Sequence, residues 1–187
     1  MNFNRHFELQ GRHATLRASS PAWLNYNDDK MASVYFTQMA AARGTRLHQL
    51  AHDLIREGVK LPRTQKTLNM YVNDCIGWKM TPEVPLYYSE NAFGHADAMS
   101  FRQNILRISD LKTGVNEAKV VQLEVYTAFF CLEYRIKPME IDRIELRIYQ
   151  NDEVAEFLAD PVTIMLIIDK IIAFDKLINR LKEEATL

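Results

Sequence analysis

The chain has 187 residues, of which 48% are apolar and 25% are charged, and its formal net charge is -1. This length and apolar fraction are sufficient for one sizeable core, so we expect a single globular domain. The near-neutral balance excludes a chain that is basic throughout. Cys75 and Cys131 lie in apolar surroundings without the spacing of metal ligands, and no apolar run near the N-terminus resembles a signal peptide. These features are typical of a reduced cytoplasmic protein with buried thiols.

Helices are expected in the first eighty residues. Ser20 is a suitable N-cap and Pro21 a suitable first helical residue. Two longer helices are predicted over about 29–57 and 64–80, and Gly44 is the point at which the first could break.

Apolar residues within the first long helix recur at helical spacing and predict one buried stripe, formed by Leu47, Leu50, Ala51, Leu54 and Ile55. His48 falls at the edge of this stripe, where it could reach the end of a neighbouring sheet. His52 is expected to turn further toward solvent. Periodicity alone does not separate a structural role for His48 from a ligand role.

Strands are predicted over 83–88, 94–101, 105–112 and 141–149, and a helix over 117–134 joins the last two. Because side chains alternate along a strand, Asp110 and Lys112 should project from one face while Leu111 points the other way into a core.

The segment from Gly94 to Gly114 is the most informative part of the chain, because it reads as a hairpin that gathers Asp97, Asp110 and Lys112. Carboxylates that converge from adjacent strands suit Mg²⁺ or Mn²⁺, and a nearby lysine can hold a hydroxide or a developing phosphate charge. Taken alone, the sequence from Asp110 to Gly114 could equally be a strand that ends in an ordinary turn with solvated charges. Glu83, at the head of its strand, is either a supporting acid or a solvated strand end.

The predicted helix over 117–134 places Lys119, Gln122 and Tyr126 on one face. A C-terminal helix over about 161–184 is strongly apolar, but charged residues interrupt it well short of a membrane span. Its stripe of isoleucines either packs on the sheet or serves a partner subunit; the stripe consists of Ile164, Ile168, Ile171 and Ile178.

Charge is unevenly distributed along the chain. The segment from Arg43 to Lys66 contains six basic and two acidic residues, a local charge of +4. The segment from Glu140 to Leu187 contains eleven acidic and six basic residues, a local charge of -5. This asymmetry suits a polyanion that approaches from one side, although solvated helix faces would give the same pattern.

Four short motifs occur in a recognisable order: Gly44-Thr45-x-x-His48, Gly94-x-x-Asp97, Asp110-x-Lys112 and Gln122-x-x-x-Tyr126. With them the chain resembles the PD-(D/E)XK nuclease superfamily, in the RecB-like branch that includes many phage-encoded exonucleases. The resemblance implies an α/β fold with a restriction-endonuclease-like core, a central mixed sheet of about four strands flanked by helices. It also implies one nuclease domain over 1–187, with a helical part at about 20–80, a sheet core at about 83–149 and a C-terminal helix at about 161–184.

The same resemblance implies a divalent-metal-dependent DNA nuclease, with an exonuclease favoured, that hydrolyses phosphodiester bonds in phage or prophage DNA recombination or processing. The implied catalytic residues are Asp97, Asp110, Lys112, Gln122 and Tyr126, and the implied metal ligands are His48, Asp97, Asp110 and the backbone carbonyl of Leu111. The cofactor would be Mg²⁺ or Mn²⁺. Some relatives carry a four-cysteine iron–sulfur cluster, for which this chain lacks the cysteines.

The expected partners are DNA and a recombination protein, with a homo-oligomer as a further expectation and no membrane association, in the cytoplasm of a bacterial host. Two alternatives stay open. The first is a catalytically silent DNA- or protein-binding module on the same fold. The second, a sequence-specific restriction-type endonuclease, is disfavoured because so short a chain leaves little for an element that reads bases.

Overall fold

The computed structural model describes residues 7, 14–114 and 118–185, and it divides the chain into two compact units, Met1–Thr45 and Arg46–Leu187. This division does not test the assignment of the whole chain to one nuclease domain, which stays a prediction. The helix α1 (Asp28–Glu57) begins in the first unit and ends in the second.

In the first unit, the 3-10 helix η2 (Pro21–Asn25) precedes α1. Ser20 and Pro21 occupy the N-cap and first-turn positions as predicted, but the Ser20 side chain makes no capping hydrogen bond. The following helix α1 is capped by Asn27, whose Oδ1 accepts a hydrogen bond from the backbone N–H of Lys30 at 2.9 Å.

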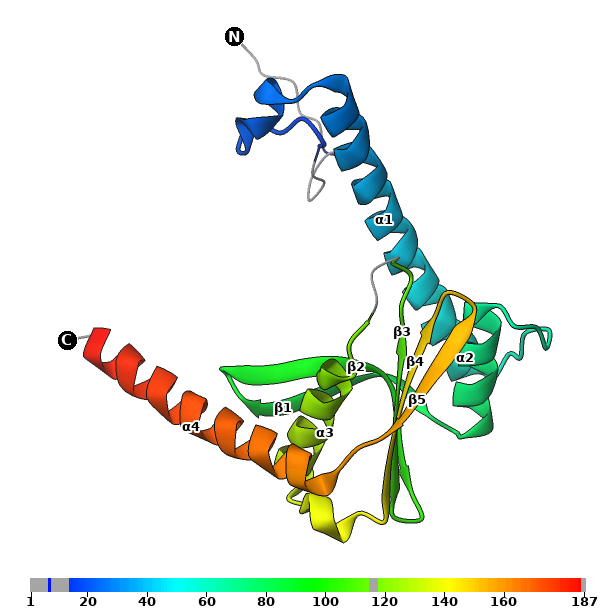
Figure 1. Cartoon of the computed structure of the whole chain (residues 1–187), viewed down its shortest axis with the longest axis vertical. Helices are drawn as coiled ribbons and strands as arrows, with labels where there is room; N and C mark the ends of the chain where they lie inside the picture. Colours follow the sequence, from blue (N-terminus) through cyan, green and yellow to red (C-terminus); the bar gives the residue numbers. More distant parts are fainter. Residues whose placement is uncertain (1–6, 8–13, 115–117, 186–187) are drawn as a thin grey trace. The chain divides into compact units, whose positions relative to one another are not determined.

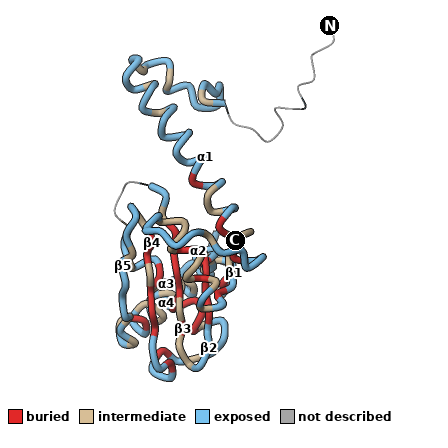
Figure 2. Tube along the Cα trace, turned by 90° about the vertical axis from the view of Figure 1, so that its right-hand side faces the viewer, coloured by how far each residue is buried: buried red, intermediate tan, exposed pale blue. Residues whose placement is uncertain are grey.

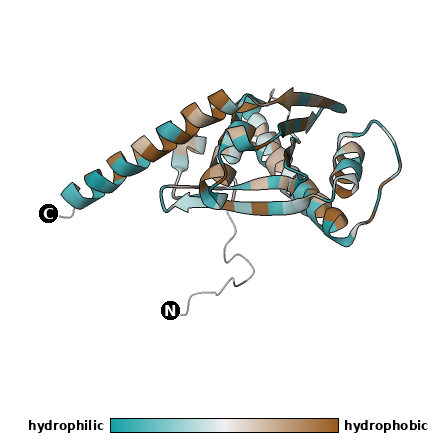
Figure 3. Ribbon diagram, turned by 90° about the horizontal axis from the view of Figure 1, so that it is seen from below, coloured by the Kyte–Doolittle hydropathy of each residue, from teal (hydrophilic) through white to brown (hydrophobic). Residues whose placement is uncertain are grey.

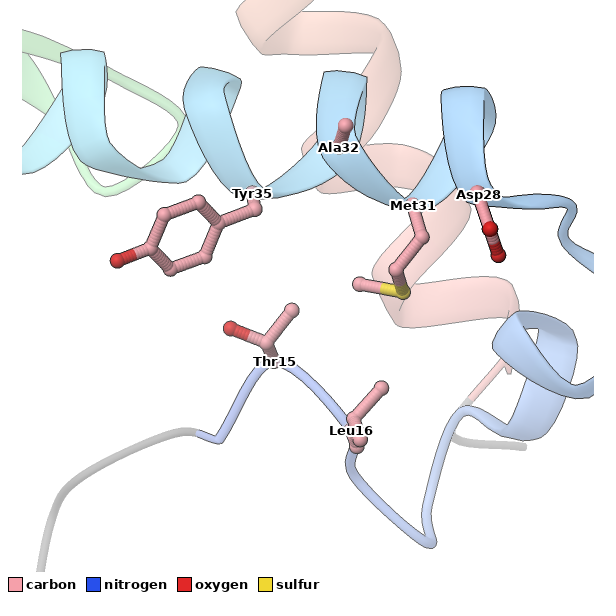
Figure 4. Close-up of a pocket in the computed structure, with 6 residues that line it drawn as sticks. All are labelled: Thr15, Leu16, Asp28, Met31, Ala32 and Tyr35. Atoms are coloured by element: carbon pink, nitrogen blue, oxygen red, sulfur yellow. The ribbon is translucent and has the colours of Figure 1, made fainter.

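A cavity of about 550 Å³ lies in the first unit, where the segment before η2 faces the first turns of α1 (Figure 4). Its lining is formed by Thr15, Leu16, Asp28, Met31, Ala32 and Tyr35. None of the predicted site residues lines it.

The helix α1 continues through Gly44, so the predicted break at this residue is wrong. One glycine costs a helix only about 1 kcal/mol, and the preceding run of alanines favours the helix. The helix ends instead at Glu57, where the φ of 68° at the following Gly58 allows the backbone N–H of Val59 to donate a hydrogen bond to the carbonyl of Leu54 at 2.9 Å.

The second unit is built on a mixed sheet of five strands (Figure 1). In spatial order these are β1 (Thr81–Ser89), β2 (Ala92–Arg102), β3 (Ile105–Leu111), β4 (Arg143–Gln150) and β5 (Glu153–Leu158). The central pair β3/β4 is parallel and the other pairs are antiparallel. The α/β fold and the four predicted strands are confirmed, but the sheet has a fifth strand. The prediction missed β5, which follows β4 through a tight turn at Asn151 and Asp152, both with positive φ.

Helices cover both faces of this sheet. The helices α3 (Val121–Tyr134) and α4 (Pro161–Ala185) pack on one face, and α2 (Thr67–Gly77) packs on the other with the C-terminal part of α1. Figure 2 shows buried residues concentrated along the strands between these layers. Cys75 and Cys131 are free and buried, as predicted.

Two predictions about α1 need correction. Ala51 and Ile55 are buried, but Leu50 is 46% exposed, because the short helix α2 covers only a narrow stripe of α1. His52 is not the more solvent-exposed histidine: its side chain is 22% exposed and that of His48 is 31% exposed.

The helix α4 packs on the sheet layer only along its first half. Ile164 is buried, and Ile168 and Ile171 pack against the core, whereas Ile178 is exposed. Apolar residues continue along the second half of α4 (Figure 3), so part of the predicted stripe has no cover within the described residues. Within the same part of the chain, no helix is long and apolar enough to cross a membrane.

Candidate functional site

Three acidic residues lie side by side across β1, β2 and β3. In β1 and β2, Pro82 pairs with Ala98 and Val84 with Ala96, so Glu83 stands opposite Asp97. The pairing of Ala98 with Ser109 likewise brings the next residues, Asp97 and Asp110, alongside each other. Figure 1 shows β1 and the first part of β2 turning away from β3, so these acids lie where the sheet bends.

His48, Glu83 and Asp97 form a compact group of ligand atoms. One atom from each side chain lies within 4.8 Å of the other two. His48 approaches from α1, with its Nδ1 3.5 Å from Asp97 Oδ2. An imidazole nitrogen and two carboxylates at this spacing can coordinate a divalent cation.

Glu83 has an unusual backbone conformation. Its φ is 51° within β1, in the left-handed region that residues other than glycine rarely adopt. Such a conformation costs about 1–3 kcal/mol and is found most often at functional sites. At Glu83 it interrupts the ladder directly opposite Asp97, and the carboxylate joins the group around His48.

Asp110 is the most deeply buried charged residue of the site, with its side chain 2% exposed. Lys112 Nζ lies 3.0 Å from Asp110 Oδ2, but the angle does not satisfy a hydrogen bond, and this oxygen has no other partner among the described residues. A buried carboxylate oxygen without a hydrogen bond is costly. The ammonium of Lys112 at 3.0 Å offsets part of that cost through its charge.

Lys112 is held from its other side by α3. Its Nζ donates a hydrogen bond to Gln122 Oε1 at 2.9 Å, and Gln122 Nε2 donates one to Tyr126 Oη at 3.0 Å. The shared helix face predicted for Gln122 and Tyr126 is confirmed, whereas Lys119 precedes α3 and does not share it. The chain from Asp110 to Tyr126 therefore fixes where the ammonium group lies.

Gly94 leaves room for the ring of Tyr126. A Cβ atom at Gly94 would lie 3.0 Å from Tyr126 Cε1 and 3.7 Å from Phe129 Cε2. This close approach gives a steric reason for the glycine in the motif Gly94-x-x-Asp97.

Burial and, second, the negative charge of Asp110 together raise the pKa of Asp97 to about 6. The backbone N–H of Leu111, which donates to Asp97 Oδ2 at 2.9 Å, opposes this rise in pKa, as do His48 and Lys112. Like charges that face each other in a buried site make proton or metal binding favourable.

The structure brings together all the residues predicted for the site, in two groups. His48 and Asp97 join Glu83, and Asp110 joins Lys112, Gln122 and Tyr126; the N–H of Leu111 links the groups through Asp97. The carbonyl of Leu111 as a metal ligand stays a prediction. Glu83 is more central than the sequence indicated, because its place opposite Asp97 depends on the register of β1.

These residues fit Mg²⁺ or Mn²⁺. The donors are the carboxylate oxygens of Glu83 and Asp97 and the imidazole of His48, which such ions accept.

A comparison of the chain with protein-family models finds no match, and a comparison with curated proteins finds no significant relative. Among solved structures, the chain is similar to the crystal structure of SSO0001, with 16% sequence identity and a TM-score of 0.35 over 82% of this chain and 68% of that chain.

Proposed function

We propose that this protein is a divalent-metal-dependent DNA nuclease of the PD-(D/E)XK superfamily, in its RecB-like branch. The observation that supports this best is the meeting of His48, Glu83 and Asp97 beside the Asp110–Lys112 pair at the bend of the sheet. The proposal favours an exonuclease that acts in phage or prophage DNA recombination or processing in the bacterial cytoplasm, together with a recombination partner.

His48, Glu83, Asp97 and Asp110 would hold Mg²⁺ or Mn²⁺. When bound, such an ion lowers the pKa of a coordinated water and neutralises charge on the scissile phosphate. Asp97 accepts the Leu111 N–H, which keeps one of its oxygens oriented toward His48 and Glu83.

Lys112 would stabilise the negative charge that develops on the phosphate and orient the attacking water. Its ammonium is held between Asp110 and Gln122, so the charge is already in position before substrate arrives. Tyr126 and Gln122 act as positioning residues, because they reach Lys112 only through hydrogen bonds.

The test is degradation of end-labelled linear duplex DNA with Mg²⁺ or Mn²⁺ by the wild type and by Lys112→Met, which keeps most of the length of the side chain but removes its charge. Cleavage should fall by at least a hundredfold, because the charge that faces the phosphate is lost. Lys176→Met, on the exposed surface of α4, is the matched control and should cleave normally.

Equal cleavage by Lys112→Met and the wild type would contradict the site assignment. A wild type that binds DNA without cleaving it would instead identify a binding module on the same fold. Closed circular DNA, added as a second substrate, separates an exonuclease from an endonuclease because it offers no ends.

A further inference from the structure

The loop between α1 and α2, residues 58–66, concentrates basic charge. It contains Lys60, Arg63 and Lys66 and no acidic residue, and all three side chains are exposed. Lys66 is neutralised by Asp152, with 2.8 Å between Nζ and Oδ2. Lys60 and Arg63 form no ion pair with any residue that the structure describes.

This loop lies at the same end of the sheet as the candidate site. Asp152, in the turn after β4, binds Lys66 and also accepts a hydrogen bond from the backbone N–H of Thr67 at 2.9 Å. Because β4 runs parallel to β3, the turn after β4 lies at the end where β3 delivers Lys112. The Lys112 N–H donates to the carbonyl of Tyr149 in β4 at 2.9 Å, which confirms this proximity of the two strand ends.

Two asparagines of α2 hold the loop in place. Asn73 makes two hydrogen bonds with the backbone of Leu61, one to its carbonyl and one from its N–H, each at 2.9 Å. Asn69 Nδ2 donates to the carbonyl of Pro62 at 2.9 Å and to Thr64 Oγ1 at 3.0 Å. The backbone that carries Lys60 and Arg63 is therefore ordered without a ligand, so binding would cost little entropy.

A cavity of about 480 Å³ opens beside the loop. Lys60, Arg63, Thr64, Gln65 and Asn73 contribute to its lining. Asp74 also lines it, but its Oδ2 accepts a hydrogen bond from Tyr149 Oη at 2.8 Å. The lining also includes the apolar residues Leu61 and Met70, and its two cations outnumber the single carboxylate, so the surface carries a net positive charge suited to phosphate.

We propose that the loop of residues 58–66 binds the DNA backbone outside the cleavage site, with Lys60 and Arg63 contacting phosphates without reading the base sequence. This inference rests on the proposed nuclease function and adds a second substrate-binding region to it. From His48 to the end of α1 at Glu57 the helix rises about 13 Å, because each residue adds about 1.5 Å. A duplex of 20 base pairs, which rises about 3.4 Å per base pair, is therefore long enough to span both regions.

The experiment measures binding of a fluorescent 20-base-pair duplex by anisotropy, in EDTA to prevent cleavage, over a series of salt concentrations. The double variant Lys60→Ala/Arg63→Ala is compared with Lys176→Ala/Arg180→Ala. This control removes the same charge from exposed positions of α4, in the layer on the other face of the sheet. A second readout is hydrolysis of bis(p-nitrophenyl) phosphate with Mn²⁺, a diester too small to reach the loop.

The loop variant should bind DNA about tenfold more weakly for each lost contact at 0.1 M salt, and its plot of log affinity against log salt should be shallower by about 2. The control should bind like the wild type, and both variants should hydrolyse the small diester normally.

Wild-type affinity and salt dependence in the loop variant would overturn the inference, as would equal losses in the two double variants. Normal hydrolysis of the small diester verifies that the loop variant is folded. If the wild type cleaves neither substrate while DNA binding still depends on Lys60 and Arg63, the nuclease function fails and the binding loop stands.

Discussion

Replacing Asp97 with asparagine should stabilise the metal-free protein and remove its response to metal. The pKa of Asp97 is raised to about 6, first by burial and then by the charge of Asp110, whereas an ordinary aspartate has a pKa of 3.8. The folded protein therefore binds this proton more tightly than the unfolded chain does. Its free energy of unfolding falls as the pH rises from about 4 through 6 and levels off above about 7.

The pKa difference sets the size of the effect. The change from 3.8 to about 6 corresponds to about 3 kcal/mol at pH 8, and the Asp97 side chain is only 20% exposed, so solvent screens little of it. Asparagine has nearly the same shape and can still accept the Leu111 N–H through its Oδ1. Asp97→Asn should therefore be more stable than the wild type by about 1–3 kcal/mol at pH 8 in EDTA.

Urea denaturation at pH 4, 5, 6 and 8 measures this, first in EDTA and then with Mn²⁺. In EDTA, the wild type should lose stability as the pH rises and the variant should lose less. Added Mn²⁺ should stabilise the wild type at pH 8, because it binds only the folded protein, and should leave the variant nearly unchanged. A variant that is no more stable than the wild type at pH 8 in EDTA would refute the account of charge repulsion at the site.

Two further substitutions separate metal binding from positioning. Glu83→Gln should lower Mn²⁺ affinity by at least tenfold in calorimetry, because a ligand charge is lost, and wild-type affinity would exclude Glu83 as a ligand. Since Glu83 is exposed, the free energy of unfolding in urea with EDTA should change by less than about 0.5 kcal/mol. Gly94→Ala should slow DNA cleavage several-fold at unchanged Mn²⁺ affinity, because the new Cβ would displace Tyr126 and loosen the hydrogen bonds that hold Lys112. Cleavage at the wild-type rate would show that the position of the Lys112 ammonium does not depend on Tyr126.

Much of the sheet could be predicted from local patterns. The alternation of side chains around Asp110 and Lys112 identified β3, and the helical spacing of Gln122 and Tyr126 correctly placed them on one face. The strand β5 was missed although Asn151 and Asp152 favour a two-residue turn, because the six residues of β5 are mostly exposed and include two glutamates, which weakens the strand pattern. The break at Gly44 was wrong because a weak local preference was overridden by its helical neighbours.

The arrangement of the site depends on information that no local pattern carries. Glu83 meets Asp97 because of the register between two strands and a left-handed backbone conformation, neither of which follows from its own residue type. The burial of Asp110 likewise depends on α3 packing over β3, although strand alternation correctly placed the side chains of Asp110 and Leu111 on opposite faces of the sheet. Sequence could name these acids as candidates, but only the tertiary fold shows which of them share a site.

Diffraction from crystals soaked in Mn²⁺ at pH 8, measured at the manganese absorption edge, tests the central claim most directly. We expect an anomalous peak about 2.1 Å from a carboxylate oxygen of Asp97, with Glu83 and His48 as further ligands. Crystals of Asp97→Asn should lack it. A protein that binds no Mn²⁺ there, or binds it only at other acidic residues, would contradict the assignment of this site.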